Sequence, residues 1–113
     1  MLPRVVGLGR AMEMSMLGDA VDAEEAYRIG LVNRVVADGS LSEEARNLAN
    51  RLAVMPTVAL GRIKHALYAS FERDVEMALE AEAEGQTFCG YTQDHKEGVT
   101  AFFEKREARF TGR

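Results

Sequence analysis

Cysteine, histidine and tryptophan are scarce in this 113-residue chain, which has one cysteine, two histidines and no tryptophan. Cys89 has no partner for a disulfide bond within the chain, and His65 and His95 have no other ligand residue at metal-binding spacing. We therefore expect no metal site and no iron–sulfur cluster. The single cysteine also favours a reducing compartment, so we expect a cytoplasmic location.

An excess of positive charge is also lacking. The 14 lysines and arginines are outnumbered by 18 aspartates and glutamates, which gives a net charge of −4. Nucleic-acid binding needs a clustered basic surface, so we expect no nucleic-acid partner. No apolar run approaches the roughly 20 residues of a membrane-spanning helix, and residues 1–4 are not followed by the apolar stretch of a secretion signal. We expect a soluble chain with no membrane partner.

Helical periodicity is what the sequence does contain. Apolar residues recur with helical spacing in segments that begin near residues 5, 23, 40, 56, 74 and 94. The first two segments predict helices over residues 5–17 and 23–29. In the helix that opens at Pro56, one stripe of side chains is predicted to be buried, namely Leu60, Ile63, Leu67 and Phe71. The pattern therefore predicts five or six helices.

Three of these helices open with the spacing of a capping box, in which two side chains each satisfy the other's free backbone N–H. The three pairs are Asp22 with Glu25, Ser40 with Glu43, and Asp94 with Glu97. We expect each pair to fix the start of its helix.

Residues 31–36, with the sequence Leu-Val-Asn-Arg-Val-Val, form the one segment with strand character, between Gly30 and a turn at residues 37–39. The predicted fold class is therefore all-α with one short β-strand, in a single helical domain over residues 1–113. One strand cannot satisfy its own backbone and must pair with another. No second strand is visible, so the strand predicts a partner outside this sequence.

Residues suited to catalysis are few. Gly7 and Gly9 lack the third glycine and the preceding strand of a dinucleotide-binding loop. Residues 72–84 carry six carboxylates and one arginine, a net charge of −5. Paired glutamates can act as general acid and base, but nothing apolar flanks these carboxylates, and a solvated helix face is the simpler explanation of the acidic run. No catalytic residue is assigned from the pattern alone.

One cluster near the end of the chain has the chemistry of a binding site. Lys105, Arg106 and Arg109 follow the aromatic pair Phe102 and Phe103. Cations beside an aromatic surface can hold a phosphate and stack an adenine-like ring. A basic helix C-terminus favoured by the helix dipole is the alternative, and the sequence leaves both open.

Several stretches resemble the enoyl-CoA hydratase/isomerase (crotonase) family in order and spacing. Residues 2–7 look like its "LPR-x-hydrophobic-G" segment, and residues 17–26 resemble its "TG-x-x-hydrophobic-x-A-x-EA" signature. Residues 30–36 are similar to its "GLV-x-x-V" strand, and Lys64 to the lysine of its "K-x-x-hydrophobic" segment. Residues 94–106 and 110–112 resemble its ending, "D-x-x-EG-x-x-AF-x-EKR" followed by "F-x-G". The match covers nearly the whole chain.

The resemblance implies acyl-CoA chemistry, in which two backbone N–H groups stabilise the enolate of a CoA thioester. In the family these groups, and the glutamates of the hydratases, precede the "LPR" segment, so no catalytic residue is carried over to this chain. The resemblance leaves two candidate CoA-binding residues, Lys105 for a phosphate and Phe102 for the pocket wall. It implies no cofactor besides the CoA thioester as substrate, and it implies self-association through trimer-type contacts.

Three functions remain open at this point. The first is the carboxy-terminal region of an enoyl-CoA hydratase/isomerase, which closes the acyl-CoA pocket and assembles the oligomer without catalysis of its own. The second is a stand-alone helical assembly module with no link to catalysis. The third is an independent enzyme whose site lies on the acidic helix.

Overall fold

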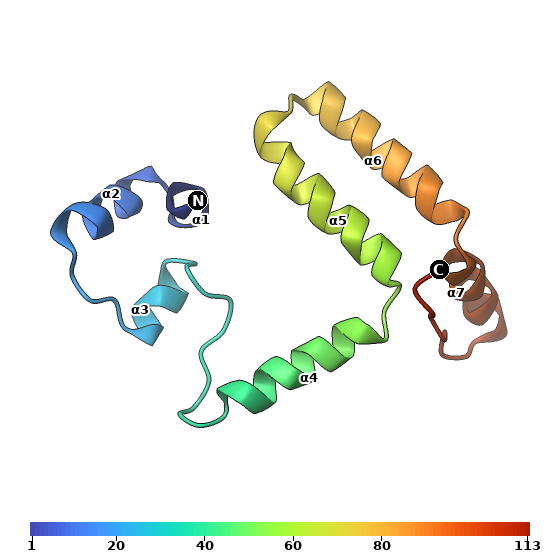
Figure 1. The fold of residues 1–113 in the computed structure, drawn as a ribbon, viewed down its shortest axis with the longest axis horizontal. Helices are drawn as coiled ribbons and strands as arrows, with labels where there is room; N and C mark the ends of the chain where they lie inside the picture. Colours follow the sequence, from blue (N-terminus) through green and yellow to red (C-terminus); the bar gives the residue numbers. More distant parts are fainter. The chain divides into compact units, whose positions relative to one another are not determined.

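The computed structural model describes residues 1–113 and contains seven α-helices and one short 3-10 helix (Figure 1). It contains no strand, so the predicted fold class was wrong in its single β-strand and low in its number of helices. The chain divides into two compact units, residues 1–44 and 45–113. No helix combines the length and the apolar character needed to cross a membrane.

The first unit holds α1 (Leu2–Val6), α2 (Leu8–Leu17) and α3 (Ala23–Arg28). The helix predicted over residues 5–17 is interrupted at Gly7, whose φ of 81° and ψ of 158° are incompatible with a continuous helix. Only glycine adopts this conformation readily, because it has no Cβ. Gly7 therefore ends α1 and starts α2, and this is why the first predicted helix is two helices.

Asp22 caps α3 as predicted, since its carboxylate accepts a hydrogen bond of 2.8 Å from the backbone N–H of Glu25. The second hydrogen bond of the predicted capping box, from the Glu25 side chain, is replaced by an ion pair. The Glu25 carboxylate instead accepts a hydrogen bond of 2.6 Å from the Arg28 guanidinium. That hydrogen bond, more than any other contact, lowers the pKa of Glu25. Opposite charges one turn apart stabilise a helix in this way.

Residues 31–36 form a bend followed by irregular backbone where a strand was predicted. The end of α3 uses the first amides of the segment. The Leu31 N–H donates to the Ala26 carbonyl at 2.8 Å and the Gly30 N–H to the Tyr27 carbonyl at 3.1 Å, with Gly30 left-handed at a φ of 75°. This is the glycine-terminated helix end known as the Schellman motif. With those amides engaged and no second extended segment in the chain, the apolar run cannot form a ladder.

The second unit contains most of α4 (Leu41–Ala53, which begins in the first unit), α5 (Thr57–Ala69), η1 (Ser70–Glu72), α6 (Val75–Gly90) and α7 (Gln93–Glu104). Helices α5 and α6 run antiparallel as a hairpin through η1 (Figure 1). Asp74 caps α6, because its carboxylate accepts a hydrogen bond of 2.8 Å from the Met77 N–H. The hairpin leads directly into α7 and the C-terminal tail.

The buried apolar residues are three alanines, Ala11, Ala26 and Ala101, and no large side chain is fully buried. The apolar stripe predicted from Pro56 onward was expected to be buried, and that was wrong for most of it. Leu60 is half-buried, but Ile63 and Leu67 of α5 are 56% and 64% exposed and Phe71 of η1 is 53% exposed. Exposed apolar faces of this extent are typical of surfaces that contact another polypeptide.

Candidate functional site

The start of α7 differs from the predicted Asp94–Glu97 capping box. Thr92 is the cap, and its hydroxyl accepts a hydrogen bond of 3.1 Å from the His95 N–H. Asp94 lies in the first turn, is 3% exposed, and directs its carboxylate at the C-terminal tail. It accepts hydrogen bonds of 2.7 Å and 2.8 Å from the N–H groups of Thr111 and Gly112. The prediction failed because these partners, 17 and 18 residues away, replace the local one.

Glu97 is the second carboxylate that holds the tail. Its two oxygens accept hydrogen bonds of 2.6 Å and 2.9 Å from the guanidinium of Arg106, and one of them also accepts a bond of 2.8 Å from the Arg109 N–H. These bonds lower the pKa of Glu97 to about 2, with the Arg106 side chain as the largest cause and the Arg109 backbone as the next. The same pairing, together with Glu104, raises the pKa of Arg106.

Two glycines allow the tail to lie against the rest of the unit. A Cβ on Gly98 would lie 3.5 Å from the ring of Phe110, so the small residue lets that ring pack on α7. Gly112 has a φ of 76°, and a Cβ there would lie 2.5 Å from the Thr57 hydroxyl oxygen at the start of α5. The tail therefore closes back on both α7 and α5.

Lys105, one of the two predicted CoA-binding residues, terminates α7 in the left-handed conformation, with φ 55° and ψ 39°. It is the one residue other than glycine with a positive φ in the chain. Its N–H donates to the Phe102 carbonyl at 3.3 Å, and the Arg106 N–H donates to the Ala101 carbonyl at 3.1 Å. This conformation costs a residue with a side chain about 1–2 kcal/mol. Its side chain is exposed and makes no ion pair.

Phe102, the other predicted residue, lies on the last turn of α7 and is 78% exposed. Its ring meets that of Phe103 edge to face, with centroids 5.7 Å apart and planes at 76°. Both rings line an apolar hollow of about 490 Å³ between the ends of α5, α6 and α7, which Val99 and Phe110 also line. The structure therefore brings Phe102 and Lys105 to the same end of one helix, and Phe102 lines the apolar hollow there.

The three cations of the predicted cluster differ in their availability. Arg106 is committed to Glu97 and, through its Nε at 2.6 Å, to Glu104. Arg109 lies in the tail and contributes its backbone N–H to Glu97. The Lys105 ammonium has no such commitment. No sequence signal indicated the role of Glu97, because its partners lie nine and twelve residues further along the chain.

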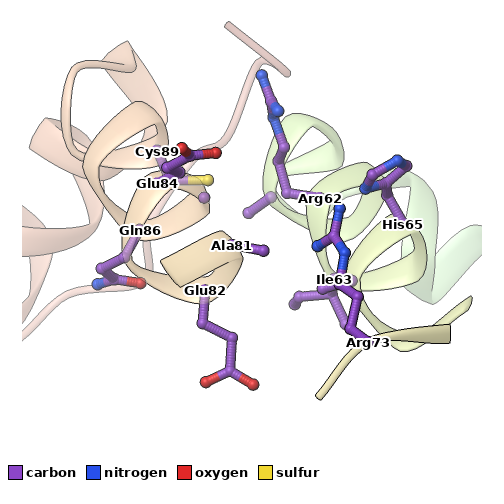
Figure 2. Close-up of a pocket in the computed structure, with 12 residues that line it drawn as sticks. Arg62, Ile63, His65, Arg73, Ala81, Glu82, Glu84, Gln86 and Cys89 are labelled. Carbon is purple, nitrogen blue, oxygen red and sulfur yellow. The ribbon is translucent and has the colours of Figure 1, made fainter. Parts of the chain in front are cut away.

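A second hollow separates α5 from α6, with a volume of about 340 Å³ (Figure 2). Arg62 and His65 line it from α5, whereas Glu82, Glu84 and Cys89 line it from α6. The Arg62 guanidinium lies over the Phe88 ring at 4.0 Å, a cation–π contact that fixes this side chain. No group of three or more histidine, cysteine, aspartate or glutamate residues is arranged to hold a metal ion.

The acidic run of α6 does not form an enclosed site. Glu76 and Glu80 are exposed and make no ion pair, and the same is true of Glu84 at the edge of the α5–α6 hollow. Acid/base catalysis needs burial or a charged neighbour to separate the pKa values of two carboxylates. In the structure, the acidic run is therefore a solvated helix face.

The whole chain, residues 1–113, matches the enoyl-CoA hydratase/isomerase family model, and the protein belongs to that family. It is 40% identical to the 1,2-epoxyphenylacetyl-CoA isomerase of Escherichia coli (strain K12) over 113 residues, which are 100% of this chain and 43% of the relative. It is 41% identical to the crotonyl-CoA hydratase of Syntrophomonas wolfei over 109 residues, 96% of this chain and 42% of the relative.

Solved structures agree. The enoyl-CoA hydratase of Geobacillus kaustophilus HTA426 superimposes with a TM-score of 0.95 at 37% identity, over 99% of this chain and 42% of that one. The enoyl-CoA hydratase of Bacillus anthracis gives 0.93 at 34% identity, over 99% and 43%. The chain thus spans less than half the length of these relatives. An isomerase and several hydratases match it at similar identity, so the similarity alone does not select one reaction.

Proposed function

We propose that this chain is the helical region of an enoyl-CoA hydratase/isomerase family enzyme that closes the acyl-CoA site and assembles the oligomer. Family membership supports the reaction class. The observation that carries the proposal is at the end of α7, where the Lys105 ammonium makes no ion pair and Phe102, three residues earlier, is 78% exposed and lines an apolar hollow. An ammonium and an apolar wall are what the phosphates and the acyl-pantetheine arm of a CoA thioester require.

In this proposal the chain binds and orients, and it supplies no acid, base or nucleophile. Lys105 holds a phosphate of CoA and Phe102 forms part of the pocket wall. The oxyanion hole for the thioester enolate and the acid/base groups belong to the part of the family fold that this chain does not span. Water exclusion by the aromatic end of α7 would strengthen every electrostatic contact inside the closed site.

The uncovered apolar faces support the assembly half of the proposal. Leu67 on α5 and Leu79 on α6 are 64% and 60% exposed. Many other large apolar side chains of the chain are exposed too. Complete burial of each such side chain is worth about 1.5–3 kcal/mol, so a few of them suffice to drive association. We infer that the chain self-associates through trimer-type contacts.

The proposal is tested with the 113-residue chain by titration calorimetry with CoA and crotonyl-CoA, together with its mass in solution. We expect CoA binding that weakens about tenfold in Lys105→Ala, because a hydrogen bond to a charged group is worth about 1.5–3 kcal/mol. Lys96→Ala is the matched control, since it removes an exposed lysine from the other end of the same helix. We expect no turnover of crotonyl-CoA by the chain alone.

Equal CoA binding by the wild-type chain and Lys105→Ala would contradict the role of Lys105. Turnover by the chain alone would overturn the assignment of the chemistry to the rest of the fold. Stable association without any CoA binding would favour the alternative, a helical assembly module, for which the exposed apolar faces are the supporting observation.

A further inference from the structure

We propose that Glu97 is a positioning residue that holds Lys105 in the orientation required to bind the phosphate of a CoA thioester. The inference rests on the proposed function of Lys105 and adds a residue that does not itself touch the ligand. Glu97 lies on the second turn of α7, whereas Lys105 ends that helix. The connection between them runs through Arg106.

The carboxylate of Glu97 joins three parts of the chain. It accepts two hydrogen bonds from the Arg106 guanidinium, at 2.6 Å and 2.9 Å, and one from the Arg109 N–H, at 2.8 Å. A bidentate carboxylate–guanidinium pair fixes direction as well as distance. Arg106 and the first turn of the tail therefore have a single position relative to α7.

Lys105 lies directly before Arg106 and depends on that position. Its left-handed backbone is unfavourable for a lysine, and the Arg106 N–H, bonded at 3.1 Å to the Ala101 carbonyl, closes the turn that contains it. If Glu97 releases the guanidinium, the turn can relax to the common right-handed or extended backbone. The direction in which the lysine side chain leaves the helix then changes, and the exposed ammonium has no other contact to retain it.

The negative charge of Glu97 allows a positioning role to be distinguished from a simple charge effect, because the two predict opposite changes in phosphate binding. A carboxylate near an anion site opposes phosphate binding, so its removal should strengthen binding if charge alone matters. Positioning predicts the opposite result, namely weaker phosphate binding in a variant with one negative charge fewer.

The test measures the affinity of the full chain for CoA relative to pantetheine, which has the same thiol arm and no phosphate. We expect Glu97→Gln to lower this ratio about as much as Lys105→Ala does, roughly tenfold, and the double variant to be no lower than either single one. Glu107→Gln is the matched control, because it removes the same charge from the tail that follows α7 and its carboxylate makes no ion pair. We expect it to leave the ratio unchanged or slightly higher.

A change in the backbone of Lys105 is the second readout, and it needs no ligand. The three-bond coupling between the amide and α protons of Lys105 and its carbon-13 shifts report the positive φ by nuclear magnetic resonance. Glu97→Gln should move them while the shifts of residues 95–101 stay helical. A ratio that is unchanged or raised in Glu97→Gln, or a Lys105 that keeps its left-handed signature there, would overturn the inference.

Failure of the proposed function gives a different pattern. If the wild-type chain binds CoA no better than pantetheine, Lys105 is not a phosphate ligand and the proposed function is wrong. If Lys105→Ala lowers the ratio and Glu97→Gln does not, the proposed function survives and the positioning role of Glu97 is wrong.

Discussion

Asp94 fixes the C-terminal tail to the start of α7, and its replacement by alanine should release that tail. Asp94 is 3% exposed, and its carboxylate accepts bonds of 2.7 Å and 2.8 Å from the N–H groups of Thr111 and Gly112. Hydrogen bonds to a charged group contribute about 1.5–3 kcal/mol each. The two bonds belong to one network and the freed amides regain water, so we expect Asp94→Ala to lower the free energy of unfolding by about 3 kcal/mol.

Urea denaturation followed by circular dichroism measures this loss. With a denaturant slope of about 1–3 kcal/mol per molar for a small protein, the midpoint should fall by about 1–3 M. Hydrogen exchange places the effect, because the amides of Thr111 and Gly112 should lose protection in Asp94→Ala. Asp94→Asn should be intermediate, since its amide oxygen can accept one of the two bonds while its NH₂ group cannot accept the other.

Asp74→Ala is the matched control for this reasoning. Asp74 accepts one bond, from the Met77 N–H at an exposed helix start, so its loss should lower the free energy of unfolding by about 1 kcal/mol. An Asp94→Ala variant no less stable than Asp74→Ala, with Thr111 and Gly112 still protected, would refute the claim that Asp94 holds the tail.

Three further predictions follow from the same unit. Gly112→Ala should lower the free energy of unfolding, measured by urea denaturation, by about 1–3 kcal/mol, because its Cβ would lie 2.5 Å from the Thr57 hydroxyl. Gly39→Ala is the control for the cost of a side chain at positive φ, because Gly39 also has a positive φ but lies in open space. Lys105→Gly should raise the melting temperature while it weakens CoA binding, since glycine relieves the left-handed strain and removes the ammonium; a lower melting temperature would contradict the assigned strain. Because folding lowers the pKa of Glu97 from 4.5 to about 2, its stabilising contribution is complete above pH 4.5 and is lost as the pH falls toward 2. Glu97→Gln should therefore flatten the dependence of the urea midpoint on pH in that window, and an unchanged slope would count against the pairing.

Features set by neighbouring residues could be predicted from the sequence. Asp22 and Asp74 cap their helices because the N–H they accept from lies three residues away, within the reach of a local pattern. Asp94 and Glu97 have the same spacing and do something else, because the folded tail brings better partners to them from 9 to 18 residues away. A local pattern contains no information about such competition.

Features set by absent neighbours could not be predicted correctly. The apolar run at residues 31–36 has the composition of a strand, but a strand exists only as one side of a ladder, and no other segment of the chain supplies the other side. The stripe of α5 has the periodicity of a buried face, yet Ile63 and Leu67 are more than half exposed. In both cases the composition indicates a contact that the chain by itself does not make.

The candidate site was predicted from the family resemblance, and the role of its two residues in CoA binding stays a prediction. Most positions of the carboxy-terminal signature have a structural contact. Asp94 and Glu97 hold the tail, Arg106 with Glu104 completes that network, Gly98 admits the Phe110 ring, Ala101 is buried, and Gly112 lies against Thr57. Phe102 and Lys105 differ from these positions, because Phe102 is 78% exposed with its ring against that of Phe103, and the Lys105 ammonium makes no ion pair. A motif whose other members all serve the fold leaves these two side chains available for a ligand, and binding measurements on Lys105→Ala decide whether they meet one.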